Sequence, residues 1–472
     1  MEAVKVGLFG IGLDTYWDQF EGLRNNLENY LFRIQVSLKK NGAEVINAGL
    51  IDNPEKASRA ATLLKSHDIE IVFLYISTYA LSSTVLPVVQ SLKVPVVILN
   101  MQPVSQLDYA SFNALGDRGK KTGVWLEHCQ ACSVPEIAGV FNRAGVRYDI
   151  VTGYMEDESA WNEIKSWTEA AKVAWQLRNN RMGILGHYYG GMLDVYTDLT
   201  RLSFTFGTHF EMLEMCELKK MRDEVTEHEI MEKLAEFRST FEVLKECDQV
   251  EQVRAAKTSV ALDKLVKEHN LSSLAYYYEG TAGNEYENIV TSVIAGNTLL
   301  TGKNIPIAGE CEVKNAQAMK IMAGLGAGGS FSEFYLMDFK DDVVYLGHDG
   351  PAHFAIAEGK VKLVPLPVYH GKPGKGLSIQ MTVKNGPVTL LSVVEGKDSI
   401  FLLVAEGESV PGPVLEIGNT NSRYKFPLPV KDFINTWSKQ GPAHHCAIGV
   451  GHMAGKIEKL SKILNIDVVK IC

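Results

Sequence analysis

The first third of the chain alternates short apolar runs with longer segments of helical spacing. Residues 4–10 (VKVGLFG) form an apolar run that ends in glycine, and residues 20–42 place apolar side chains at helical spacing before another glycine. The alternation continues along the chain through 43–51, 53–68, 69–77 and 94–100. Apolar strands separated by helices predict a parallel sheet with helices on both faces.

A second α/β pattern begins at residues 181–198 (RMGILGHYYGGMLDVYTD). Residues 210–270 are rich in glutamate and lysine at i, i+4 spacing, which predicts a layer of solvated helices. From about residue 355, alternating apolar positions are separated by NG and EGKD turns and by prolines, which is typical of an antiparallel sheet or small barrel.

We therefore expect an α/β protein with three domains. Two Rossmann-like doubly wound parallel-sheet domains would span residues 1–174 and 175–328, and an antiparallel β-barrel-like domain would span residues 329–472. The glycines of residues 7–14 (GLFGIGLD) follow the order GxxGxG rather than GxGxxG, so they do not favour a dinucleotide site.

Composition and charge narrow the function classes. Acidic residues outnumber basic ones, 56 to 47, which gives a net charge of −9 and argues against a nucleic-acid or anionic-membrane surface. The chain shows no basic segment followed by an apolar core near residue 1 and no apolar run of membrane-spanning length. With seven cysteines in a long chain, we expect reduced thiols and a cytoplasmic protein.

Cys129 and Cys132 form an isolated CxxC motif. Such a pair can be redox-active or can supply half of a zinc site, but no second CxxC is present to complete four sulfur ligands. Two neighbouring residues of a helix without a chemical role are the commoner explanation.

Four short motifs in the second half place metal-capable side chains after apolar or glycine-rich segments. They are SLAYYYEG with Glu279, IPIAGEC with Glu310, VVYLGHDG with His348, and GPAHHC with the pair His444 and His445. A single such residue is usually an exposed side chain or a hydrogen-bonded core histidine. Together, two carboxylates and two imidazoles are ligands that suit Mn²⁺, or Co²⁺ or Mg²⁺, at a site with open positions.

The four motifs resemble those of the L-arabinose isomerase family. YYYEG, IAGECE, YLGHDG and GPAHHC occur in the family's order, and GLGAGGSFSEFY is similar to its GLQGGTSFMEDY segment. The resemblance extends weakly over nearly the whole chain. It implies a Mn²⁺-dependent aldose–ketose isomerase, a sugar as substrate, and a homo-oligomer, specifically a hexamer.

The resemblance also implies residue roles. Glu279, Glu310, His348 and His445 would bind the metal, and Glu279 and Glu310 would pass a proton between C1 and C2 through an enediol. His444, Met192 and Ser133 would contact the substrate. Two assignments stay open: Glu285 or Glu287 can replace Glu279 as the first ligand, and His444 can exchange roles with His445.

The chain departs from the family where sugar hydroxyls would be recognised. Ser133 stands where the family has a histidine that reaches a neighbouring subunit, and HDG replaces SHM in the third motif. The expected substrate is therefore a pentose or a hexose rather than L-arabinose specifically. The alternative is a non-catalytic sugar-binding or regulatory protein on the same scaffold. A metal-dependent hydrolase has no support, because HExxH and GxSxG are absent.

Overall fold

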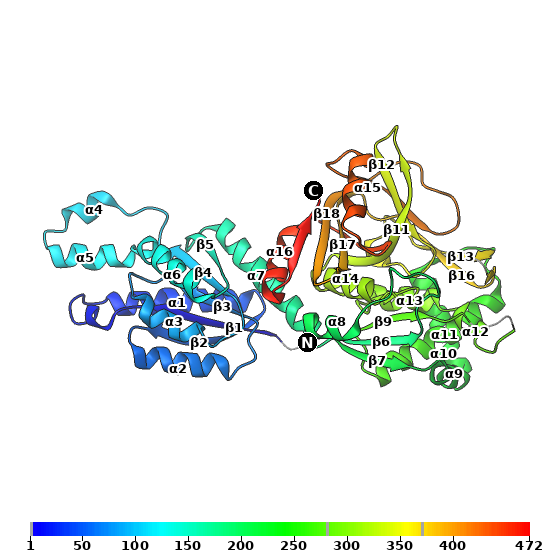
Figure 1. Cartoon of the computed structure of the whole chain (residues 1–472), viewed down its shortest axis with the longest axis horizontal. Coiled ribbons are helices and arrows are strands. Elements are labelled where there is room, and N and C mark those ends of the chain that lie inside the picture. Colours follow the sequence, from blue (N-terminus) through cyan, green and yellow to red (C-terminus); the bar gives the residue numbers. More distant parts are fainter. Residues whose placement is uncertain (1–2, 280–282, 370–371) are drawn as a thin grey trace. The chain divides into compact units, whose positions relative to one another are not determined.

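The computed structural model describes residues 3–279, 283–369 and 372–472, and the chain forms two compact units, Met1–Trp175 and Gln176–Cys472 (Figure 1). The first unit is built on a parallel sheet in the order β2-β1-β3-β4-β5. Its strands are β1 (Val4–Ile11), β2 (Ala43–Ile51), β3 (Ile71–Tyr75), β4 (Val96–Gln102) and β5 (Tyr148–Tyr154). Every residue of β3 is buried, because helices cover the sheet on both faces.

The helices of the first unit follow its strands. They are α1 (Leu23–Lys40), α2 (Pro54–Lys65), α3 (Ser82–Val89), α4 (Tyr109–Ala114), α5 (Arg118–Glu127), α6 (Gln130–Ala144) and α7 (Glu158–Arg178), with a 3₁₀ turn at Asp14–Tyr16. In this strand order the direction of chain progression reverses between β1 and β3, which is where doubly wound sheets form their ligand crevice.

The second unit contains another parallel sheet, in the order β10-β9-β6-β7. Its strands are β6 (Arg181–Gly186), β7 (His209–Leu213), β9 (Ser273–Tyr277) and β10 (Ile307–Ala308). Its helices are α8 (Leu199–Phe206), α9 (Met215–Asp223), α10 (Glu227–Thr240), α11 (Gln249–Glu268), α12 (Glu287–Val290), α13 (Ile294–Gly302) and α14 (Val313–Gly324).

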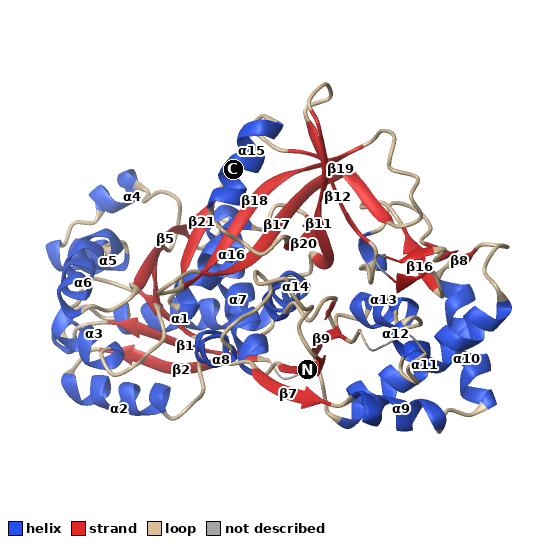
Figure 2. Cartoon of the chain, turned by 45° about the vertical axis from the view of Figure 1, so that its right-hand side comes forward, coloured by secondary structure: helices blue, strands red, loops and turns tan. Residues whose placement is uncertain are grey.

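The same unit carries a closed antiparallel barrel, drawn in red in Figure 2. Its six strands are β11 (Gly328–Asp338), β12 (Val343–His348), β17 (Gly386–Glu395), β18 (Ile400–Val410), β19 (Thr420–Lys425) and β20 (His445–Val450). They run in the order β17-β20-β11-β12-β19-β18, and pairing of β17 with β18 closes the ring. Closure leaves none of these six strands as an open edge.

Shorter elements complete the second unit. Strands β8 (Glu242–Val243), β13 (Lys362–Pro365) and β16 (Leu377–Gln380) form a small sheet, and β14 (Val368–Tyr369) pairs with β15 (Lys372–Pro373). A 3₁₀ turn at Phe354–Ile356, the helices α15 (Val430–Lys439) and α16 (Ala454–Leu464), and β21 (Asp467–Lys470) alongside β18 make up the rest.

The predicted fold class is confirmed: two parallel sheets with helices precede an antiparallel barrel. One hydrophobic cluster joins the central sheet to the barrel interior, including Leu274, Ile307, Leu390 and Ile448. The division into three domains stays a prediction, since the central sheet and the barrel share one compact unit. Within the described residues, no helix is both long and apolar enough to cross a membrane.

Candidate active site

One wall of the site is the carboxyl edge of the central parallel sheet. β6 leads into His187, Tyr188 and Tyr189, and β10 leads into Gly309 and Glu310. The carboxyl ends of parallel strands meet at one edge, so these residues lie together although they are far apart in sequence. The Tyr189 N–H donates to the carbonyl of Glu310 at 3.3 Å, which ties the two loops to each other.

The turn that carries Glu310 has an unusual backbone. Glu310 and Cys311 both have positive φ, at 54° and 58°, in the left-handed region that residues with a Cβ rarely occupy. The Cys311 N–H donates to the carbonyl of Tyr276 at 2.9 Å and helps to hold this conformation. Two consecutive residues with strained backbone, of which the first, Glu310, points its carboxylate into the site, are typical of a functional site.

The other wall comes from three neighbouring strands of the barrel. In the antiparallel register, Glu333 of β11 lies directly opposite His445 of β20. On the other side of β11, Glu333 lies opposite Gly347 of β12, and His348 is the last residue of that strand. Directly opposed residues in a sheet have neighbouring side chains, so strand pairing alone brings Glu333 and His445 together.

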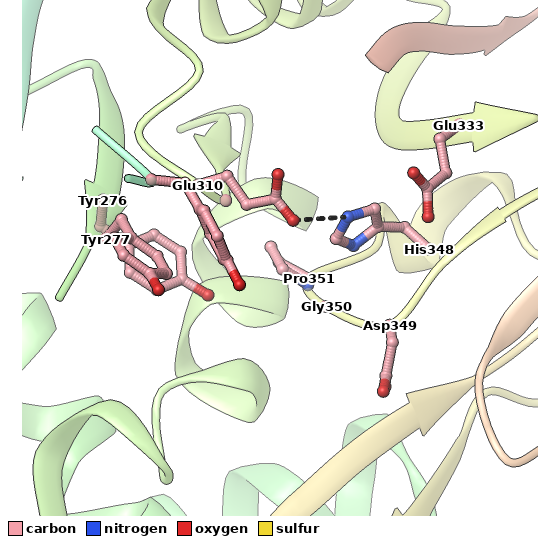
Figure 3. A pocket seen from close by; sticks show the side chains of 10 residues that line it. Tyr276, Tyr277, Glu310, Glu333, His348, Asp349, Gly350 and Pro351 are labelled. Atoms are coloured by element: carbon pink, nitrogen blue, oxygen red, sulfur yellow. Dashed lines mark ion pairs between the residues drawn. The ribbon is translucent and has the colours of Figure 1, made fainter. Parts of the chain in front are cut away.

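Two overlapping groups of side chains have the composition of a metal site. The first is Glu310, His444 and His445, the second is Glu333, His348 and His445, and the ligand atoms within each group lie within 4.8 Å of one another. Glu310 also faces His348, with 4.0 Å between Oε1 and Nε2 (Figure 3). Carboxylate oxygens and imidazole nitrogens converge on one volume from both walls.

Glu310 and His445 face each other with buried polar atoms that a cation could bind. Glu310 Oε2 and His445 Nε2 lie 3.4 Å apart, and both atoms are buried without a hydrogen-bond partner among the described residues. Buried polar atoms in proteins nearly always have partners. An ion between the two atoms would satisfy both, so this donor set fits a divalent metal.

A buried charge network lies behind His445. Glu312 is fully buried, and its Oε2 lies 3.4 Å from His445 Nδ1, the ring nitrogen that faces away from Glu310. Lys314 Nζ lies 3.6 Å from Glu312 Oε1 and donates to the carbonyls of Asp194 and Tyr196. A carboxylate on the second nitrogen of a metal-binding histidine fixes the ring's orientation and makes it a better ligand.

His444 points to a different partner. Its backbone N–H donates to Asp194 Oδ2 at 3.0 Å, and its ring Nδ1 lies 2.6 Å from the same oxygen. Partial burial alone would lower the pKa of His444. The carboxylate of Glu310, with Oε2 3.6 Å from His444 Nε2, and the hydrogen-bonded carboxylate of Asp194 outweigh the burial and raise the pKa to about 9. In the absence of a metal ion, these two carboxylates favour the protonated form of His444.

The two walls line a pocket of about 80 Å³ that opens to solvent (Figure 3). The Tyr189 and Tyr277 rings stack at a tilt, with 4.6 Å between their centroids. The pocket is lined by Tyr189, Tyr276, Tyr277, Gly309, Glu310, Glu333, His348, Asp349, Gly350 and Pro351.

The structure brings Glu310, His348, His444 and His445 together, but Glu279 belongs to neither metal-capable group. Glu279 is exposed after the end of β9, where it hydrogen-bonds to Tyr277 at the pocket. The second metal-capable group contains the carboxylate of Glu333, which is not among the predicted site residues. The signal was present, because GLGAGGSFSEFY contains Glu333 and had been matched to a family segment.

The remaining predicted residues belong to neither metal-capable group. Met192 is half-buried in the loop between Tyr189 and Asp194, beside the site. Ser133 is buried in α6 of the first unit. The two alternatives to Glu279 make other contacts: Glu285 lies 3.8 Å from Lys219, and Glu287 accepts the backbone N–H of residue 283.

Comparison with known proteins gives two relatives. No family model matches the chain. A sulfoquinovose isomerase of Alkalicoccus urumqiensis is 21% identical over 326 residues, which cover 69% of this chain and 72% of the relative. L-arabinose isomerase 1 of Bacillus licheniformis is 21% identical over 336 residues, covering 70% of this chain and 67% of the relative. The chain is thus similar, over 69% and 70% of its length, to two sugar isomerases, one of them an L-arabinose isomerase.

Proposed function

We propose that the protein is a metal-dependent aldose–ketose isomerase acting on a pentose or a hexose. Both relatives are sugar isomerases, which supports the enzyme class. The observation that carries the metal requirement is the buried pair of Glu310 Oε2 and His445 Nε2, which face each other without hydrogen-bond partners among the described residues. Nothing in the site favours the non-catalytic alternative.

Glu310, Glu333, His348 and His445 would hold the ion. Two carboxylates and two imidazoles suit Mn²⁺, with Co²⁺ or Mg²⁺ as alternatives. The bound ion would act as a Lewis acid that polarises the sugar carbonyl. Glu312 would keep the His445 ring in place for this task, and Lys314 would balance the charge of Glu312.

The proton transfer would use carboxylates on opposite walls of the pocket. Glu310 and Glu333 both line it, one on the loop after β10 and the other on β11. One carboxylate would remove the proton from C2 of the aldose, and a proton would be delivered to C1 of the enediol. This assignment replaces Glu279 with Glu333 as the partner of Glu310. Glu279 would contact the pocket only through its hydrogen bond to Tyr277.

The lining supports a neutral sugar as substrate. It contains three carboxylates, on Glu310, Glu333 and Asp349, and the described residues that line it include no lysine or arginine. A sulfonated sugar would need a cationic partner, for which His444 at the edge of the site is the nearest candidate. His444 and Met192 remain candidates for substrate contacts. Ser133 already bonds to the backbone of Thr78 and Ala80, so a substrate contact would compete with these bonds.

The direct test is an isomerisation assay on the full chain. The protein is stripped with a chelator, reconstituted with Mn²⁺, and supplied with aldopentoses, aldohexoses and a sulfonated hexose. We expect ketose formation from one neutral sugar that requires added metal. Sugar binding without turnover, in folded protein with metal bound, would support the sugar-binding alternative, and release of two products would indicate a hydrolase.

The assembly and the location of the protein are also part of the proposal. The family resemblance implies a homo-oligomer, specifically a hexamer, in the cytoplasm. Light scattering on the purified chain measures the number of subunits directly. A monomer that retains full isomerase activity would contradict the expected homo-oligomer.

A further inference from the structure

We propose that Cys129 and Cys132 form a reversible dithiol–disulfide site in the first unit, independent of the isomerase chemistry. The two Sγ atoms lie 2.6 Å apart. A disulfide bond is about 2.05 Å long, so little movement separates the thiol pair from the bonded state. Both residues carry free thiols in the structure, and neither belongs to a metal-capable group among the described residues.

The start of α6 gives the two thiols different roles. Cys129 is the N-cap residue of α6 and is 3% exposed, whereas Cys132, in the first turn of the helix, is exposed. Burial, followed by the hydrogen bond to Cys132, raises the pKa of Cys129 to about 12. Cys132 is therefore the thiol that reagents reach first, and Cys129 is the resolving thiol behind it.

Side-chain bonds from the neighbouring residues hold the motif in place. Gln130 Nε2 donates to the carbonyl of Ser77 at 3.2 Å, and Ser133 Oγ donates to the carbonyl of Thr78 at 3.3 Å. The Ala80 N–H donates to Ser133 Oγ in return, at 3.2 Å. These bonds anchor the CxxC segment to the loop after β3, so both cysteines keep their positions while a bond forms or breaks.

The site lies where a doubly wound sheet binds its ligands. Tyr16 follows β1 and Tyr79 follows β3, the two strands between which the chain direction reverses. Burial raises the pKa of Tyr16, and the charges of Tyr79, Cys129 and Cys132 add to the rise. The dithiol thus occupies an accessible edge of the first unit rather than its core.

The oxidant would be a small-molecule disulfide such as oxidised glutathione. The Cys132 thiolate attacks one of its sulfurs, forms a mixed disulfide and releases one thiolate. Cys129 then passes its proton to solvent, and its sulfur attacks Cys132 Sγ and releases the second thiolate; both released thiolates take up protons from solvent. The protein loses two hydrogens and two electrons, and the small disulfide is reduced to two thiols, so the exchange is balanced.

The test is peptide mapping of the full chain. Reduced protein is incubated with oxidised glutathione, the remaining thiols are blocked with a maleimide, and the protein is digested with trypsin. The tryptic peptide 122–143 contains both cysteines and no others. We expect this peptide to appear unblocked and two hydrogens lighter, and to regain two blocking groups after treatment with dithiothreitol.

Variants separate the two roles. Cys129→Ser should accumulate a stable glutathione adduct on Cys132, and Cys132→Ser should leave Cys129 unmodified. Cys216, which is exposed in the second unit, is the control, because it has no partner for resolution and should stop at the adduct. A wild-type peptide that keeps both thiols free, or that stops at the glutathione adduct as Cys216 does, would overturn the proposal.

Discussion

At the residue scale, most residues of the candidate site could be predicted from short sequence motifs, but one, Glu333, could not. Glu310 and His348 each follow a glycine at the end of a strand, and His445 begins β20 after the GPAH segment, so these short motifs could be recognised in the sequence. Glu333 lies inside strand β11, and neither of its sequence neighbours is a glycine or a turn residue. Its place opposite His445 comes from strand register, which depends on which strands pair and is not visible in a single sequence.

Glu312 offers a residue-scale test of the charge network. Replacing Glu312 with Gln keeps the side-chain shape but removes the negative charge behind His445. We expect Mn²⁺ affinity to fall by roughly 10–100-fold, the usual cost of losing a carboxylate that orients a metal-binding histidine. Isothermal titration calorimetry on the chelator-stripped protein measures the change. Glu416→Gln, at an exposed position, is the matched control, and an equal loss in both variants would refute a positioning role for Glu312.

At the element scale, the alternation of apolar and polar positions was sufficient to predict the order of sheets and helices. It was less informative about the helices of residues 210–270, which were expected to be solvated. α11 instead buries a broad face that includes Ala255, Ala261, Leu262 and Leu265, and contributes it to the main core. Small alanine side chains between charged residues give a weak apolar signal, yet they allow neighbouring helices to pack closely.

The C-terminus of α11 gives a pH-dependent prediction. His269 caps this helix, and its Nε2 lies 2.6 Å from Glu217 and its Nδ1 3.3 Å from Glu211. The bond to Glu217 is the main cause that raises the pKa of His269. The protonated form is therefore favoured in the folded state, and its stabilising effect is full below the unfolded pKa of about 6.5 and is lost as pH rises through the folded value.

His269→Gln should thus lower the melting temperature more at pH 6 than at pH 9. The expected difference is roughly 2 °C, because the charge at the helix terminus and its bonds contribute about 1 kcal/mol. Circular dichroism melts at both pH values measure it. His228→Gln, at an exposed position on α10, is the control. A loss that is equal at both pH values would show that His269 acts by packing rather than by charge.

At the scale of the whole molecule, the sequence predicted the fold class but not how the barrel closes. Closure requires β17 to pair with both β18 and β20. The pattern of apolar residues along the sequence does not show which of the possible strand pairs has the lowest free energy. The residues of the candidate site all lie in the second unit, split between the central sheet and the barrel. Because both walls share one hydrophobic core, a ligand that bridges them acts on the whole second unit.

Metal binding should therefore stabilise the second unit and leave the first unchanged. At a free Mn²⁺ concentration 100 times the dissociation constant, mass action adds about 2.7 kcal/mol to the free energy of unfolding. Hydrogen exchange with and without Mn²⁺ should show slower exchange in β11, β12, β20 and the turn at 309–312. Equal slowing in β1 and β3 of the first unit would contradict a site confined to the second unit.

In the proposed mechanism, Glu310 and Glu333 are the carboxylates that hold the metal and move the proton. The most direct test is kcat for the best sugar of the Mn²⁺-loaded enzyme, compared between Glu333→Gln and Glu279→Gln. We predict that Glu333→Gln lowers kcat by about 10²–10⁴-fold, as expected for loss of a general acid–base group, while Glu279→Gln stays within a few-fold of wild type. Near-normal turnover by Glu333→Gln with a collapse in Glu279→Gln would contradict the account and return Glu279 to the site.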